Sequence, residues 1–292
     1  MTTQEGTRVS SVRLLARNPI TLVSAVVLAV VAVIAVFAQA IVPYGINDVD
    51  VPNALQSPSG AHWLGTDDLG RDVLSRVLVA VQASMRIAVT SVALALVVGV
   101  AIGVVAGYRG GWLDTALMRV VDVMFAFPVL LLALAVVAIL GPGVTTTILA
   151  IGIVYTPIFA RVARASTLGV RTEPYVQMSR AMGTGDGYIL RRHILPNISG
   201  PLIVQTSLSL AFAILSEAAL SFLGLGIQPP EPSLGRMIFD SQGFVTMAWW
   251  MAVFPGAAIF VIVLAFNMFG DGLRDVLDPK QRTTAEARRR DR

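Results

Sequence analysis

Few residues in this sequence could do chemistry. The chain contains no cysteine, one lysine and two histidines, His62 and His193. Thiol chemistry is therefore excluded. A phosphate-binding P-loop places a lysine at the end of a glycine-rich turn, whereas Lys280 follows Asp278-Pro279. The sequence also lacks the G-x-S-x-G and H-E-x-x-H patterns of hydrolases and metalloproteases, so we expect no catalytic site, no cofactor site and no metal site in this chain.

The densest group of charged side chains lies in the stretch HWLGTDDLGRDVLSR, residues 62–76. Three interpretations are open: a metal site that uses His62, a solvated start of a helix, or a contact with another protein. A contact would be made by Trp63, Asp67, Asp68, Arg71 and Asp72.

Two acidic residues fall inside long apolar runs. Glu217 is surrounded by leucine and alanine, and an ionisable residue within a membrane span indicates a functional role by default. A structural alternative is a buried residue that only packs and forms hydrogen bonds. Asp122 follows Arg119 by three residues, so the two can pair along one face of a helix, and a role in transport is the alternative.

The elements that must position these residues are membrane helices. Hydrophobic residues make up 55% of the 292 residues, charged residues only 14%, and the mean hydropathy is +0.74. About 20 apolar residues suffice for a helix to cross a bilayer. Six runs approach that length: 20–42, 87–107, 120–140, 144–160, 201–225 and 249–270. The first run is longer than the apolar part of a signal peptide, so we expect it to be retained as an anchor.

The positions of the arginines predict the orientation. With both termini inside, most of the 22 Lys and Arg residues fall in inside segments, and only Arg71, Arg76, Arg86 and Arg236 fall outside. This is the bias of membrane proteins toward basic inside loops. The basic tail, residues 278–292, is then expected to lie near anionic lipid or in solvent, and no nucleic acid is expected as a partner.

The long inside loop, residues 161–200, contains YVQMSRAMGTGDGYILRRHILPN, residues 175–197. Three arginines make it too costly to insert into a membrane. The pattern predicts a short helix capped by Thr172 and ended by Gly183, then a second helix capped by Asp186 that stops before Pro196.

Helices this short need a packing partner. Val176, Met178 and Met182 are predicted to form one apolar surface, which could pack on the spans of the chain itself or on another protein.

Small residues and prolines mark the spans themselves. Gly99, Gly103 and Gly107 repeat every four residues in the second run, which permits close approach of another helix. Internal packing is the simpler interpretation, and a subunit interface or a pore lining is the alternative. Pro128, Pro157 and Pro255 lie within runs and predict kinks.

The loop resembles the cytoplasmic signature of ATP-binding-cassette (ABC) importer permeases, which reads E-A-A, three residues, G, nine residues, I-x-L-P. Here Gln177-Met178-Ser179 is followed at these separations by Gly183 and His193-Ile194-Leu195-Pro196. The glycine and the Leu-Pro pair match, and the E-A-A and the isoleucine do not. The stretches HWLGTDDLGRDVLSR, DTALMRVVDVMFAFPVLLLAL, LSEAALSFLGLGIQPPEPSLGRMI and FNMFGDGLRDVLDP are similar to segments of the dipeptide, oligopeptide and nickel permease family, and in particular to its "C-type" subunit.

The resemblance implies an all-α type I ABC importer permease with six transmembrane helices. It implies a N-terminal part (1–83), a permease core (84–277) and a basic tail (278–292). Implied partners are a homologous second permease in a heterodimer, two cytoplasmic nucleotide-binding domains that hold ATP and Mg²⁺, and an extracytoplasmic substrate-binding protein. The implied location is the bacterial cell membrane, and the implied cargo is a peptide. The residues that would contact the ATPase are Tyr175, Val176, Gln177, Met178, Ser179, Met182, Gly183, Asp186, Leu195 and Pro196.

Two other classes of function remain as alternatives. A self-sufficient transporter or channel would need internal repeats or a chain of intramembrane ionisable groups, and Glu217 alone is thin support. An intramembrane enzyme would need catalytic side chains inside the spans, where neither histidine lies.

Overall fold

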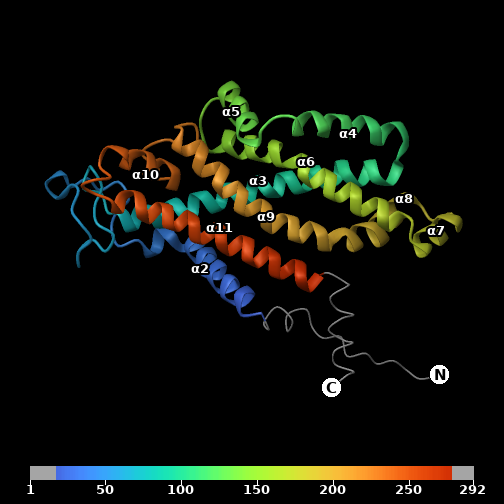
Figure 1. Ribbon diagram of the computed structural model, residues 1–292, viewed down its shortest axis with the longest axis horizontal. Helices are drawn as coiled ribbons and strands as arrows, with labels where there is room; N and C mark the ends of the chain where they lie inside the picture. Colours follow the sequence, from blue (N-terminus) through green and yellow to red (C-terminus); the bar gives the residue numbers. More distant parts are fainter. Residues whose placement is uncertain (1–17, 278–292) are drawn as a thin grey trace, which may run out of the picture.

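A computed structural model describes residues 18–277 as an elongated bundle of helices whose long members run roughly along one axis (Figure 1). No strand occurs between residues 18 and 277, where a single bridge joins Thr66 and Asp72. The elements are α2 (Pro19–Ile41), η1 (Val51–Asn53), α3 (Val73–Arg109), α4 (Gly111–Phe125), α5 (Val129–Leu140), α6 (Val144–Arg171), α7 (Pro174–Ala181), α8 (Asp186–Ile189), the π-helical turn η2 (Leu190–Ile194), α9 (Leu195–Phe222), α10 (Leu234–Asp240), η3 (Ser241–Gly243) and α11 (Trp250–Leu277).

Five helices of the described residues are long and apolar enough to cross a membrane, and the bent pair α4–α5 makes a sixth crossing if it is counted as one span. The all-helical prediction with six spans is therefore confirmed at this level. The third span was predicted over 120–140 with a kink at Pro128. The kink is confirmed, and the helix before it begins earlier than predicted, at Gly111. The chain bends by 91° between α4 and α5, because Pro128 has no N–H to donate and disfavours the helical conformation of the residue before it. Pro157 and Pro255, in contrast, lie within unbroken helices.

The second span begins earlier than predicted. α3 starts at Val73, where the Asp72 carboxylate accepts the Ser75 N–H at 2.8 Å and caps the helix. Arg86, which we placed in an outside segment, consequently lies well inside α3. The predicted division after residue 83 falls within the same helix and stays a prediction.

The second short helix does not stop before Pro196, which corrects that prediction. α8, η2 and α9 follow one another as a single span over Asp186–Phe222. The π-helical turn directly before Pro196 widens the helix, with the Leu195 N–H donating to the Leu190 carbonyl. A wider turn relieves the clash of a proline ring with the preceding turn, so the helix continues.

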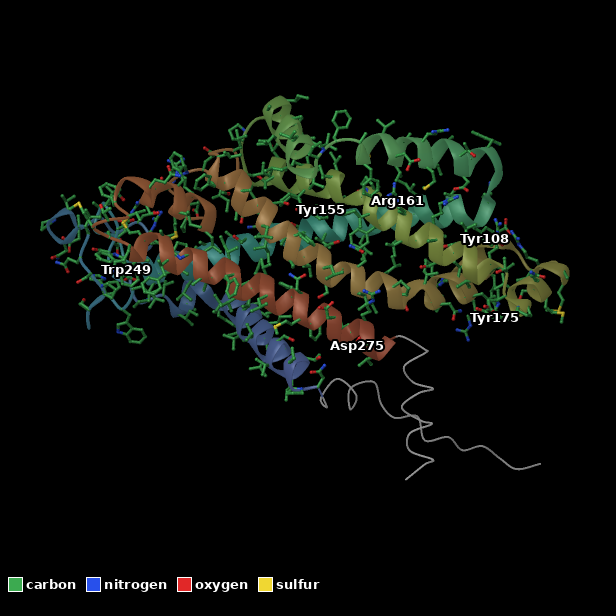
Figure 2. All side chains as sticks on the ribbon, viewed as in Figure 1. Tyr108, Tyr155, Arg161, Tyr175, Trp249 and Asp275 are labelled. Atoms are coloured by element: carbon green, nitrogen blue, oxygen red, sulfur yellow. The ribbon has the colours of Figure 1, made fainter. Side chains whose placement is uncertain are left out.

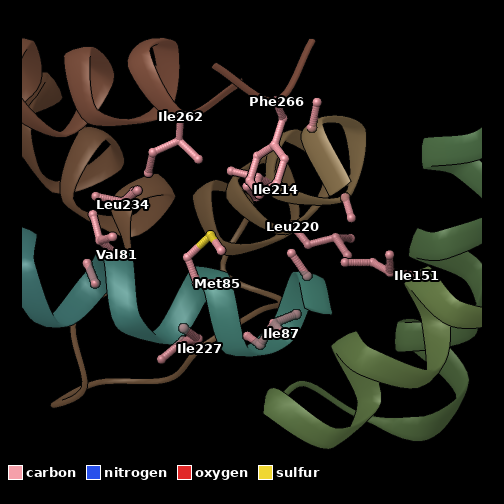
Figure 3. Packing of buried hydrophobic residues seen from close by; sticks show 14 of the residues in the cluster. Val81, Met85, Ile87, Ile151, Ile214, Leu220, Ile227, Leu234, Ile262 and Phe266 are labelled. Atoms are coloured by element: carbon pink, nitrogen blue, oxygen red, sulfur yellow. The ribbon is translucent and has the colours of Figure 1, made fainter. Parts of the chain in front are cut away.

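The main apolar core forms where α3, α6, α9 and α11 meet. Val81, Met85 and Ile87 of α3 lie among Ile214 and Leu220 of α9, with Ile262 and Phe266 of α11 across the same core (Figure 3). A second, smaller cluster lies at the end of the bundle that carries α7. Its buried members are Val104, Tyr108, Ala163, Val176, Ile189, Ile194 and Ile198.

α3 and α6 form the most extensive helix pair of the described residues, and the three glycines of α3 lie along it. A methyl group added at Gly99 would lie 2.6 Å from the Thr156 carbonyl oxygen, and one at Gly103 would lie 2.2 Å from that of Ala160. At Gly107 the nearest atom is the Arg164 carbonyl oxygen at 2.9 Å. The structure thus places all three glycines in internal packing against α6.

Candidate functional site

The loop singled out by the sequence forms the far end of the bundle, where α7 and α8 project beyond the ends of α2 and α11 (Figure 1). α7 begins with Pro174 at its first position, and Glu173, rather than Thr172, occupies the N-cap. Thr172 ends α6 instead, so that part of the prediction is wrong. Gly183 follows the helix with φ of 78°, which confirms the predicted left-handed end. The prediction that Asp186 caps α8 is wrong, because Gly185 occupies the N-cap and Asp186 is the first residue of the helix.

α7 has two different faces. Val176 is fully buried in the cluster that also contains Ile189 and Ile198. Met178 and Met182 are 63% and 72% exposed on the opposite side. The prediction that all three form one apolar surface is therefore wrong for Val176. Val176 and Met178 are two residues apart, and residues at that spacing do not share a helix face.

Polar contacts tie this loop to the end of α3. The Tyr108 hydroxyl donates to the Asp186 carboxylate at 2.7 Å, and the Arg180 Nε–H donates to the Tyr108 oxygen at 3.4 Å. The guanidinium of Arg180 also lies over the Tyr108 ring, 4.5 Å from its centroid. Figure 2 shows Tyr108 and Tyr175 together at this end of the bundle. These contacts join the loop, at two of its residues, to the end of α3, which lies more than 70 positions away in the sequence.

An aromatic group completes the loop. The His193 ring lies between Tyr175 and Tyr188, with centroid distances of 5.7 and 5.8 Å. Burial, and then the nearby Glu173 carboxylate, raise the pKa of the Tyr175 phenol, so the hydroxyl is neutral at physiological pH. The remaining candidates lie close by. The Gln177 amide donates to the Thr172 carbonyl at 3.0 Å, and the buried Ser179 hydroxyl donates to the Tyr175 carbonyl at 2.9 Å. Leu195 and Pro196 are exposed in the first turn of α9.

Glu217 lies at the contact of α9 with α3 and is completely buried. The hydroxyl of Ser84 donates to one carboxyl oxygen at 2.6 Å, and that of Ser221 donates to the other at 2.7 Å. Both oxygens thus have partners inside the chain. This is the geometry of a packing residue, which was the structural alternative for Glu217.

Asp122 pairs with a different arginine from the one predicted. Its carboxylate accepts from Arg161 of α6 at 3.0 Å, and Arg119 forms no ion pair within residues 18–277. The Arg161 guanidinium also lies 3.8 Å from the centroid of the Phe125 ring. Both charged side chains are more than half exposed, at 53% and 56%. The pair therefore lies on a rim between α4 and α6.

The charged group of residues 62–76, at the end of the bundle opposite α7, closes a loop onto α3 (Figure 1). One Asp67 oxygen accepts the backbone N–H groups of Leu69 and Arg71, and the other accepts the Arg71 Nε–H at 2.7 Å. One Asp72 oxygen caps α3 by accepting the Ser75 N–H, and the other lies 2.9 Å from Nδ1 of His62. No group of three or more potential metal-ligating side chains occurs between residues 18 and 277.

Two residues of this charged stretch remain accessible. Trp63 is 71% exposed, and the Asp68 side chain is 33% exposed. Burial and the adjacent Asp67 carboxylate raise the pKa of Asp68, although Arg71 opposes them. The geometry is that of a helix start fastened by its own loop, with Trp63 available for contact.

Several important residues carried no signal in the sequence. Ser84 and Tyr108 look like ordinary helix residues, and their roles depend on partners 133 and 78 positions away. Asp114 holds Arg164 through two hydrogen bonds, of which the Nη2 bond is 2.7 Å long. Each of these partners becomes visible only when the helices are packed.

Comparison with known proteins gives a consistent result. Residues 99–283 match the family described as the binding-protein-dependent transport system inner membrane component, and residues 10–58 match the N-terminal transmembrane domain of oligopeptide transport permease C. The dipeptide transport system permease protein DppC of Alkalihalophilus pseudofirmus is 43% identical over 92% of this chain and 88% of that protein. The glutathione transport system permease protein GsiD of Pectobacterium atrosepticum is 45% identical over 85% and 82%, respectively.

Solved structures share the fold at much lower identity. An inward-facing MetNI methionine ABC transporter aligns with a TM-score of 0.58 and 19% identity, over 70% of this chain and 96% of that chain. An amino acid ABC transporter aligns with a TM-score of 0.52 and 14% identity, over 69% and 94%.

Proposed function

Because this chain belongs to the family of binding-protein-dependent transport system inner membrane components, within which it is a "C-type" permease subunit of an ABC importer, we propose that it passes short peptides across the cell membrane while separate ATPase subunits act on it through α7. The proposal gives this chain no catalysis of its own. ATP and Mg²⁺ would be held by the ATPase subunits, and a second, homologous permease would complete the pathway.

The observation that carries this proposal is the division of α7 into two faces. Val176 anchors the helix in the bundle, while Met178 and Met182 remain exposed at its far end. Exposed methionines are adaptable contact residues, since the side chain is unbranched and flexible. An apolar surface on a short, well-anchored helix is suited to a groove on another protein.

The anchoring gives the loop a means of transmitting movement. α7 packs through Val176 on the ends of α3, α6 and α9. Arg180 of α7 and Asp186 of α8 both form hydrogen bonds with Tyr108 of α3. A displacement of α7 toward an ATPase subunit would therefore pull on three long helices together. Coupling of this kind requires a bundle with two alternative arrangements, one favoured by ATP inside and the other by a loaded binding protein outside.

The names of the relatives support short peptides as cargo. They include transporters for dipeptides and for glutathione, and a probable D,D-dipeptide transporter of Escherichia coli that is 41% identical over 95% of this chain. All of these cargoes carry a peptide bond and a free carboxylate. We propose the same class for this chain.

The test is a charge placed on the exposed face of α7. In the complete complex, reconstituted with its permease partner, ATPase subunits and binding protein, Met182→Glu should release the ATPase subunits or abolish the stimulation of ATP hydrolysis by loaded binding protein. The permease partner should still co-purify. Met247→Glu is the matched control, because Met247 is 70% exposed in the loop at the opposite end. Unchanged stimulation in Met182→Glu would refute the docking role of α7.

A further inference from the structure

The outer half of the bundle contains a cavity of about 560 Å³. Side chains from α2, α3, the start of α6 and the loop after α9 line it. The apolar lining includes Val144 and Ile227, and the polar lining consists of Gln39, Gln82, Arg86 and Glu231. Small-molecule sites in proteins have volumes of about 300–1,000 Å³ and combine an apolar wall with a few polar groups. The cavity has both properties.

Arg86 lies deep in the membrane part of the chain. The Gln82 amide donates to the Ala35 carbonyl at 2.8 Å, which fixes the level of α3 against α2. Ala35 lies six residues before Ile41, the outer end of α2, and Gln82 is at the level of Ala35. Arg86 follows Gln82 by four residues and lies one turn further inward, which makes ten residues in total. At 1.5 Å per residue, Arg86 is about 15 Å below the outer end of α2, close to the middle of a 30 Å hydrocarbon layer.

An arginine at this depth needs a polar environment, because a guanidinium in lipid is costly. Arg86 is nevertheless exposed, and neither Arg86 nor Glu231 forms an ion pair within the part of the chain that the structure describes. Gln82 lies one turn from Arg86 on the same face of α3, so two polar side chains point into the cavity together. This face of α3 is therefore built for water or a polar ligand.

We propose that this cavity is a subsite on the peptide pathway, in which Arg86 binds the terminal carboxylate of a peptide and Glu231 its terminal ammonium group. A guanidinium presents a planar fork that matches a carboxylate. Both end groups occur in every unmodified peptide, so the subsite would accept peptides irrespective of their side chains. The inference rests on the proposed function and adds to it the place and the groups that recognise the cargo.

Uptake of peptide tests the two charged residues. The probe is radiolabelled Ala-Ala, or another member of a set of di- and tripeptides if the parent complex prefers it, taken up by proteoliposomes that contain the complete complex. Arg86→Gln and Glu231→Gln should each lower the initial uptake rate about tenfold, which is the loss expected for one hydrogen bond to a charged group. Arg119→Gln is the matched control, because Arg119 is exposed on α4 outside the cavity.

The possible failures are distinguishable. If the parent complex imports none of the peptides, the proposed function is wrong and this inference falls with it. If the parent imports but both cavity variants match Arg119→Gln, only the subsite is refuted. If Arg86→Gln loses the permease partner during purification while Arg86→Lys retains it and transports normally, Arg86 serves assembly and the subsite is again refuted.

Labelling of an introduced cysteine gives a second measurement that does not depend on these variants. The chain has no cysteine of its own, so Ala83→Cys places a single thiol on the cavity wall in a complex whose other subunits are cysteine-free. A charged methanethiosulfonate reagent should react with it, and Ala-Ala should slow the reaction during turnover. Protection should vanish when Arg86→Gln is added. Val97→Cys, which lines a different cavity between α3 and α9, should show no protection. Absence of labelling at Ala83→Cys would show that water does not enter the cavity and would overturn the proposal.

Discussion

The α3–α6 contact and α7 both depend on glycines, yet they use them in opposite ways. Along α3, Gly103 lies so close to α6 that there is no room for a side chain. After α7, Gly183 has no atom within reach of an added methyl group, and only its positive φ requires glycine. In the first contact, both packing surfaces belong to helices of this chain. α7 packs on this chain through one face only, and its other face is exposed. The difference indicates where a substitution should damage folding and where it should damage coupling to another protein.

The largest effect on stability is expected at Gly103. Gly103→Val would force α3 and α6 apart and should cost about 3 kcal/mol, enough to reduce the amount of assembled complex in the membrane. Thermal unfolding of the purified complex measures this. Gly169→Val is the control, because Gly169 lies in α6 with open space around it. An equal loss of thermal stability in both variants would show that the close approach of α3 and α6 does not determine the effect of Gly103→Val.

The next largest effect is expected at Glu217, in the other closed contact of α3. Glu217→Leu leaves the hydroxyls of Ser84 and Ser221 without their acceptor and should cost about 2 kcal/mol. Glu217→Gln keeps hydrogen-bonding atoms and should assemble and transport almost normally. The measurements are co-purification with the permease partner and peptide uptake. A Gln variant that assembles but does not transport would assign the carboxyl group a direct role and remove Glu217 from the structural side of the comparison.

A smaller effect on stability, but a large one on coupling, is expected at Gly183. Gly183→Val should strain the turn after α7 by about 1 kcal/mol, because a β-branched residue disfavours positive φ. The complex should reach the membrane at normal levels and lose ATP hydrolysis stimulated by loaded binding protein. Gly185→Val should behave like the parent, since Gly185 has equally open space and a φ of −63°. If both variants retain full stimulation, the shape of this turn is irrelevant to coupling.

The smallest effect is expected at the rim of the α6 contact. Asp122→Asn should change stability by about 0.5 kcal/mol or less, because Asp122 and Arg161 are both largely exposed. Asp114→Asn should cost more, since Asp114 is only 15% exposed and binds Arg164 through two hydrogen bonds. Melting temperatures of the two variants test this order of stability effects. A greater decrease in Asp122→Asn than in Asp114→Asn would contradict it.

Much of the fold was predictable, for identifiable reasons. Long apolar runs can only be buried in a membrane as helices, so the number of spans followed from composition. The left-handed end of α7 followed from Gly183 alone. The bend before α5 followed from Pro128, which was predicted to kink its span. The continuous helix through Pro196 was harder to predict, because there a π-helical turn accommodates the proline.

By itself, the sequence determined that the chain lies in a membrane, that it has no P-loop of its own, and which loop lies between its fourth and fifth predicted spans. These properties depend on residue type and local order. Tertiary structure alone decided that Val176 faces inward while Met182 faces outward, that Asp122 pairs with Arg161, and that Arg86 shares a cavity with Glu231. Each of these facts depends on the rotation and level of one helix against another. Side chains from many positions fix that rotation together, so no local pattern contains it.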